Sequence, residues 1–138
     1  MHIRSFRMED YVQVIALWTA VGLTVGASDS RAALEHKLER DADLFLVAEG
    51  EGNDALIGAV LGAYDGRRAC INHLALAPGV QGRGLRRLLM DELEQRLHAK
   101  ECVKVNLLIK PTNAQVQDFW ENVGYDRDEL IFMAKWLV

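Results

Sequence analysis

Glycine and arginine are concentrated in one short stretch of this 138-residue chain, between two apolar runs. The glycines are Gly79, Gly82 and Gly84, and the arginines are Arg83, Arg86 and Arg87. Glycine lets an anion come close to bare backbone, and arginine adds positive charge and forked hydrogen-bond donors. The composition of the stretch therefore predicts a phosphate-binding turn. A glycine-rich turn with a solvated basic face is the simpler alternative.

The runs on either side of this turn predict a strand before it and a helix after it. The strand covers 69–78 and ends at Pro78, and the helix begins near Arg83 or Gly84. One face of that helix is apolar and carries Leu85, Leu88, Leu89, Leu93 and Leu97. The first N–H groups of a helix have no partner inside it, and the helix dipole adds partial positive charge there. Strand and helix together would thus aim free donors at a phosphate.

The rest of the chain reads as alternating strands and helices. Further strands are predicted over 2–6, 44–50, 55–66, 103–109 and 130–138, and further helices over 8–22, 31–41 and 113–124. Ser30 is suited to cap the helix at 31–41, and 65–68 reads as a hairpin turn. This order predicts an α/β (α+β) fold with a mixed, mostly antiparallel sheet.

Composition narrows the class of protein. Half of the residues are hydrophobic, and the length suits a single domain over 1–138. No apolar run approaches the ~18 residues that span a bilayer, and charges interleave the first residues as they do not in a secretory signal, so we expect a cytoplasmic protein without a membrane partner. The net charge of −4 argues against nucleic-acid binding. Cys70 and Cys102 lack the spacing of metal ligands, and no metal is expected.

Two common phosphate motifs fit the turn poorly. The GxxxxGK[ST] string of a P-loop is absent, and "GRGLRR" lacks the third glycine of a Rossmann fingerprint. Residues 81–86, "QGRGLR", instead resemble motif A of the GNAT superfamily of N-acetyltransferases, [Q/R]-x-x-G-x-[G/A]. The preceding "LALAP" resembles that family's fourth strand, and Asn113 with "FWENVGY" resembles its second motif. The likeness covers nearly the whole chain, and small bacterial members, the YpeA-like group, are the most similar.

The resemblance implies a fold and a cosubstrate. Helices would cover both faces of the sheet, and the fourth and fifth strands would splay apart to admit acetyl-CoA. Its pantetheine arm would pair with strand backbone, and its pyrophosphate would lie on the glycine-rich turn. The cofactor-binding residues implied are Leu74, Ala75, Leu76, Gln81, Gly82, Arg83, Gly84, Leu85, Arg86, Asn113 and Trp120. Asn113 would bind by its side-chain amide, or cap the helix that follows, and Arg86 replaces a small residue and must turn outward.

Trp120 stands where the family often has the tyrosine that protonates the departing CoA thiolate. An indole N–H donates a hydrogen bond but is no useful acid. Trp120 would then wall the cofactor tunnel or serve as a core aromatic, and water would protonate the thiolate. Tyr125 matches the aromatic residue that the family packs after the motif glycine.

The base that the reaction requires is sought in the strand at 69–78, where relatives often carry acidic residues. This chain has Asn72 and His73 there, and histidine is the side chain that ordinarily titrates near neutrality. Strand residues alternate between faces, which predicts that only one of the two faces the tunnel. Asp29 or Asp65 would attract a cationic amine, or serve as turn and cap residues.

By resemblance, the function is acetyl transfer from acetyl-CoA to a primary amine by direct attack in a ternary complex. The acceptor would be a small-molecule or peptide amine, and homodimer assembly is left open. The main alternative is a non-catalytic acyl-CoA binding or sensing domain that lost the acid at Trp120. A nucleotide-binding module is a third class.

Overall fold

The strands of the amino-terminal part form the sheet that carries the candidate site. The structure is a computed structural model that describes residues 1–52, 55–80, 84–109 and 114–138, except for the side chains of 114–116. It divides into two units, Met1–Leu108 and Ile109–Val138. The strands of the first unit are β1 (His2–Ser5), β2 (Phe45–Glu49), β3 (Leu56–Tyr64), β4 (Ala69–Leu76) and β5 (Val105–Leu107). Among the described residues the sheet has the order β1-β2-β3-β4-β5, antiparallel except for the parallel pair β4–β5. The predicted mixed, mostly antiparallel sheet is confirmed.

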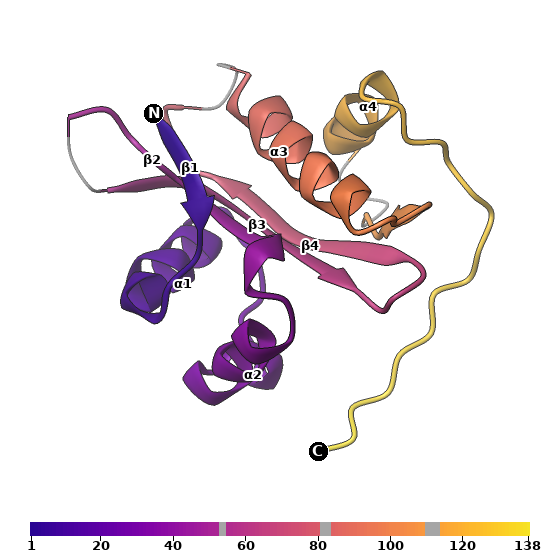
Figure 1. The fold of residues 1–138 in the computed structure, drawn as a ribbon, viewed down its shortest axis with the longest axis horizontal. Coiled ribbons are helices and arrows are strands. Elements are labelled where there is room, and N and C mark those ends of the chain that lie inside the picture. Colours follow the sequence, from indigo (N-terminus) through magenta and orange to yellow (C-terminus); the bar gives the residue numbers. More distant parts are fainter. Residues whose placement is uncertain (53–54, 81–83, 110–113) are drawn as a thin grey trace. The chain divides into compact units, whose positions relative to one another are not determined.

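Helices cover both faces of this sheet, as the resemblance implied (Figure 1). On one face lie α1 (Tyr11–Ala20) and α2 (Arg31–Asp41), and on the other lies α3 (Leu85–Ala99). Short 3-10 turns precede or follow them, η1 (Met8–Asp10), η2 (Ala27–Asp29) and η3 (Ala42–Leu44). Ser30 caps α2 as predicted, because its Oγ accepts the N–H of Ala33 at 3.1 Å.

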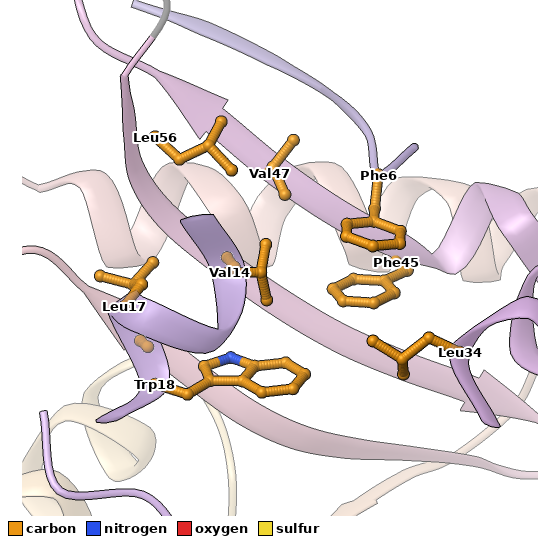
Figure 2. Packing of buried hydrophobic residues seen from close by; sticks show 10 residues of the cluster. Phe6, Val14, Leu17, Trp18, Leu34, Phe45, Val47 and Leu56 are labelled. Atoms are coloured by element: carbon orange, nitrogen blue, oxygen red, sulfur yellow. The ribbon is translucent and has the colours of Figure 1, made fainter. Parts of the chain in front are cut away.

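The core on the α1/α2 face is built around stacked aromatic rings (Figure 2). Phe6 stacks on Phe45 with ring centroids 4.2 Å apart, and Trp18 stacks on Phe45 at 6.0 Å. We call these three rings the aromatic stack. On the other face, a Cβ at Gly62 would come within 2.9 Å of Leu93, so the glycine lets α3 pack closely on β3.

The strands β4 and β5 part in the middle of β4. Their register ends at Ile71↔Leu107, where β5 also ends, while β4 continues to Leu76. The predicted splaying of the fourth and fifth strands is therefore confirmed, and residues 72–76 of β4 lie beyond the paired part.

The second unit contains α4 (Ala114–Asn122), which ends shortly before Gly124, where φ is +100°. The strand predicted over 130–138 is wrong: this segment forms neither helix nor strand. Its large apolar side chains are exposed, for example Ile131 at 91%. A continuous apolar run is typical of a buried strand, but a strand also needs a neighbour for its ladder hydrogen bonds, and the run itself carries no information on that neighbour.

Candidate active site

The turn between β4 and α3 ends in a left-handed glycine. Gly84 is the N-cap residue of α3 with φ +74°, and a Cβ there would meet nothing within 4 Å. The backbone conformation, and not crowding, therefore favours glycine. The N–H of Leu88 makes the first helical hydrogen bond, to Gly84 O at 3.1 Å, so the helix offers no acceptor to the N–H groups before it. The predicted contacts at Gln81, Gly82 and Arg83 lie outside the described residues.

The first turn of α3 has one apolar anchor and one half-buried cation. Leu85 is 3% exposed and fixes the start of the helix against the core. Arg86, predicted to turn outward, is half-buried, and burial lowers the pKa of its guanidinium below the ordinary value. An arginine remains charged after such a shift, so positive charge stays beside the helix N-terminus.

The last residues of β4 present backbone groups on the side where β5 has ended. Ala75 pairs with Ala59, and the N–H of Ala77 donates to Ile57 O at 2.8 Å, so these alternate residues direct their backbone groups at β3. Leu74 and Leu76 then direct theirs the opposite way, past the end of β5. Such an edge can accept a peptide-like ligand as an added strand.

A β-bulge interrupts β4 at His73. The register shifts between Ala59 and Leu61, and His73 has φ +51°, in the left-handed region. Asn72 pairs with Leu61 and Ala75 pairs with Ala59, and both partners pack against the α1/α2 core. The expected strict alternation is thus wrong here, because a bulge adds a residue to one strand. His73 is half-buried on the α1/α2 face, and Asn72 is exposed.

The side chain of His73 lies between an indole and a buried carboxylate. The imidazole and the ring of Trp18 have centroids 4.7 Å apart and are tilted by 57°. His73 Nε2 lies 3.5 Å from Asp29 Oδ1, and Asp29 is only 4% exposed. Sequence reasoning named His73 and Asp29 separately, and the structure brings them together; the contact of Trp18 was missed because its spacing indicated only a core position.

Asp65, the other aspartate considered for the acceptor, has a turn role. Its Oδ1 accepts the N–H groups of Arg67 at 2.7 Å and Arg68 at 2.8 Å, in the hairpin between β3 and β4. The hydrogen bonds from Arg68 and Arg67 hold the pKa of this carboxyl below its ordinary value. Asp65 therefore supports the hairpin.

In the second unit, Trp120 is 5% exposed and lies edge-on to neighbouring rings. Its ring centroid lies 5.1 Å from that of Phe119 and 5.1 Å from that of Tyr125. The role of a packed aromatic is thus present within this unit. Asn113, predicted to bind the cofactor, lies outside the described residues.

The described part of the chain lacks two further kinds of feature. There, no group of three or more His, Cys, Asp or Glu residues is arranged to hold a metal ion. None of the helices formed by those residues has both the length and the apolar character to cross a membrane.

Comparison with known proteins identifies the family. Residues 10–125 match the model of the Acetyltransferase (GNAT) family. The chain belongs to the GNAT acetyltransferases. Acetyltransferase SG1711 of Sodalis glossinidius is 37% identical over all of this chain and 96% of its own length. Acetyltransferase ECA0875 of Pectobacterium atrosepticum is 37% identical over 100% and 96% of the two chains. The resemblance inferred from the motifs is confirmed, and the GNAT protein is an acetyltransferase.

Solved structures share its fold. Ard1 from Thermoplasma volcanium superposes with a TM-score of 0.81 at 19% identity, over 93% of this chain and 84% of that one. A chain of the NatB acetyltransferase complex bound to CoA and MES gives a TM-score of 0.82 at 19% identity, over 94% and 86% of the two chains. At these identities the likeness concerns the fold.

Proposed function

We propose that this GNAT enzyme transfers the acetyl group of acetyl-CoA to a primary amine by direct attack in a ternary complex. The observation that carries the proposal is the order of features along one strand and its turn. The bulged His73 comes first, the outward-directed backbone of Leu74 and Leu76 follows, and the left-handed Gly84 opens α3. A base, an edge for a peptide-like arm and a helix N-terminus for a pyrophosphate therefore follow one another, in the order in which one extended ligand would meet them.

Acetyl-CoA fits these groups chemically. Its pantetheine arm carries amides and carbonyls, which match the backbone donors and acceptors of Leu74 and Leu76. Its pyrophosphate matches the N-terminus of α3, where Gly84 leaves open space and Arg86 adds charge. The CoA-bound NatB complex has the same fold, which supports the same cosubstrate here.

His73 is proposed as the base. The acceptor amine reaches the site as an ammonium ion and must lose a proton before its lone pair can attack the thioester carbonyl. A backbone N–H near the bulge would hold the negative oxygen of the tetrahedral intermediate. The nitrogen of the intermediate loses its second proton to water as the carbon–sulfur bond breaks and the amide forms. The CoA thiolate takes its proton from water, because Trp120 has no acid to offer.

The acceptor is proposed to be a small-molecule or peptide amine that enters from the α1/α2 face. Asp29 puts a buried negative charge next to His73, and this favours a cationic group. Asn72, exposed nearby on β4, is a further contact for the acceptor. A cytoplasmic location and a homodimer stay predictions of the sequence.

The test starts with binding. Acetyl-CoA should raise the melting temperature, because a ligand that binds the folded state stabilises it by mass action. Gly84→Val should weaken acetyl-CoA binding at least about tenfold, since a branched side chain would stand before the helix N-terminus. Gly66→Val is the matched control: Gly66 is also left-handed, φ +98°, with nothing within 4 Å of its Cβ position, but it lies in the β3–β4 hairpin. It should bind acetyl-CoA as wild type does.

The second part of the test measures turnover. Release of the CoA thiol is followed with a panel of amines, and the products are identified by mass spectrometry. Acetylated product supports the proposal. Absence of any acetyl-CoA binding contradicts it, and tight binding without turnover on any amine favours the non-catalytic acyl-CoA binding domain.

A further inference from the structure

We propose that Asp29 is a positioning residue for His73, which it holds as the Nε2-protonated tautomer so that Nδ1 keeps the lone pair that takes the acceptor's proton. The inference rests on the proposed acetyl transfer. It assigns the buried carboxylate a role in proton transfer, and it identifies the nitrogen that acts as base.

The position of Asp29 favours one tautomer of His73. Asp29 Oδ1 lies 3.5 Å from His73 Nε2, longer than the ~2.9 Å of a typical N–H···O bond, as is common for catalytic pairs before substrate binds. An ionised carboxylate only accepts hydrogen bonds, so the ring nitrogen that faces it must carry the hydrogen. In a neutral imidazole, the other nitrogen, Nδ1, then holds the lone pair.

Asp29 is held by two hydrogen bonds besides its contact with His73. Its Oδ2 accepts the N–H of Gly26 at 3.0 Å, and its backbone oxygen accepts the hydroxyl of Tyr11 at 2.9 Å. It is 4% exposed, and a buried carboxylate is costly unless it is hydrogen-bonded or paired with a positive charge. An imidazolium at His73 is a partner of that kind, so the carboxylate stabilises the charged histidine that forms during the reaction.

His73 is held just as firmly. Its ring lies against Trp18, the last member of the aromatic stack, and its backbone is left-handed at φ +51°. A non-glycine residue is strained in this conformation, and the surrounding structure must offset the strain. Such outliers concentrate at functional sites, where they aim a side chain. Its side chain keeps 27% exposure, so an acceptor can reach it.

The charged and titratable groups on the elements that pack against His73 are few in the described structure. From η2 comes Asp29, and from α1 come Trp18, which does not titrate, and Tyr11, whose hydroxyl is bonded to Asp29. The guanidinium of Arg31 lies 4.5 Å from the centroid of the Tyr11 ring, on its face. Asp29 is therefore the carboxylate in contact with the imidazole.

The proton balance is simple. An N–H bond of the acceptor ammonium breaks, and an N–H bond forms at His73 Nδ1. The imidazolium is then held by Asp29 while the freed amine attacks the thioester carbon. As the carbon–sulfur bond breaks, the amine nitrogen of the intermediate gives its second proton to water and becomes the amide nitrogen, and the CoA thiolate takes a proton from water. His73 then returns the first proton to solvent.

The decisive variant is Asp29→Asn. The amide oxygen can still accept the N–H of Gly26, and the NH2 group then faces Nε2 of His73. Since that group donates, Nε2 must become the acceptor and the hydrogen must move to Nδ1. We expect kcat to fall about 100-fold while acetyl-CoA affinity stays unchanged, because the lone pair no longer faces the acceptor. Asp65→Asn is the control: it makes the same chemical change in the hairpin and should leave kcat unchanged.

The tautomer is measured directly by NMR of protein labelled with nitrogen-15 in its histidines, at a pH where His73 is neutral. Wild type should show hydrogen on Nε2, and Asp29→Asn on Nδ1. An unchanged tautomer in Asp29→Asn, or a switched tautomer with unchanged kcat, would overturn the proposal. If Asp29→Asn does not fold, the wild-type signal decides, and hydrogen on Nδ1 rejects the assignment. If wild type acetylates no amine but the tautomer still switches, the positioning role is supported and acetyl transfer is what fails.

Discussion

Asp10 and Asp29 occupy equivalent positions in two nearly identical turns of the same protein. Each closes a 3-10 turn that leads into a helix, η1 before α1 and η2 before α2. Each carboxylate accepts a backbone N–H from the residue three positions earlier, Arg7 at 2.9 Å and Gly26 at 3.0 Å. The two are equally buried, at 5% and 4% exposure. Local structure therefore does not distinguish them.

The partner across the turn does distinguish them. Arg4 binds Asp10 through two hydrogen bonds, of 2.7 and 2.9 Å, and also pairs with Glu49. Burial opposes ionisation of Asp10, but the bonds from Arg4 and Arg7 outweigh it and hold its pKa below the ordinary value. Arginine keeps its charge at every working pH, whereas the histidine beside Asp29 can change charge and is reached by solvent. The same turn thus holds a permanent ion pair in one place and, in the mechanism that we propose, part of a proton-transfer site in the other.

The largest effect is expected at Asp10, which is paired with Arg4. Asp10→Asn should lower the free energy of unfolding by about 3 kcal/mol, because removal of one partner leaves Arg4 with an uncompensated part of its buried charge. Urea denaturation measures the loss. Asp29→Asn should cost less than Asp10→Asn, because the contact of Asp29 with His73, at 3.5 Å, is longer than the two hydrogen bonds that Arg4 makes to Asp10. Equal losses from the two variants would show that both turns are structural.

The pH dependence of stability sharpens this prediction. A carboxyl with a depressed pKa stabilises the fold above its ordinary pKa of 3.8, and that stabilisation is lost as pH falls through the lower, folded-state pKa. Wild type should therefore lose stability below about pH 4 more steeply than Asp10→Asn does. If the free energy of unfolding depends on pH in the same way for both proteins, the ion pair of Asp10 with Arg4 does not stabilise the fold.

The next effect is on turnover. His73→Ala should lower kcat about 100-fold and change the pH–rate profile, because the proposed base is lost. Acetyl-CoA affinity should stay unchanged, because the binding groups lie further along β4 and at α3. Full turnover with the wild-type profile would place the base elsewhere, with a chain of water molecules as the better account.

Local signals were enough to predict most of the fold, including the start of α3. Ser30 was recognised as a cap, and Gly84 as part of a helix start, because capping and left-handed turns depend on a few adjacent residues. The apolar periodicity on α3 predicted four buried leucines correctly, but Leu88, the fifth member of that face, is 45% exposed. The same reasoning predicted a strand over 130–138 that does not form, because strand pairing depends on a neighbour outside the segment.

The sequence named His73 and Asp29 as separate candidates, but it did not predict that they are in contact. Their contact depends on how η2 and β4 meet in three dimensions. Strict alternation gave the wrong relation between Asn72 and His73, since nothing local marks the extra residue of a bulge. A left-handed histidine carries no sequence signal of the kind that glycine gives at Gly84.

A smaller effect on stability distinguishes the contribution of the backbone conformation at His73 from that of its side chain. His73→Gly should be more stable than His73→Ala by about 1 kcal/mol, because glycine adopts φ +51° without the penalty that a Cβ brings. The two variants lose the same imidazole, so their kcat values should be equally low. Thermal unfolding measures the first difference and the amine assay the second. If alanine is the more stable of the two, the left-handed conformation belongs to the histidine side chain and not to the bulge.

The smallest effect is expected at Trp120, because its indole N–H does not titrate in the working range. Trp120→Phe removes this N–H but keeps a ring to pack on Phe119 and Tyr125, so kcat should stay within about twofold and the pH–rate profile should not move. Trp120→Tyr supplies an acidic hydroxyl and should leave kcat unchanged or raise it. Both are measured under saturating acetyl-CoA, with the melting temperature as the control for packing. A large loss in Trp120→Phe at unchanged stability would mean that the indole N–H stabilises the departing thiolate by a hydrogen bond.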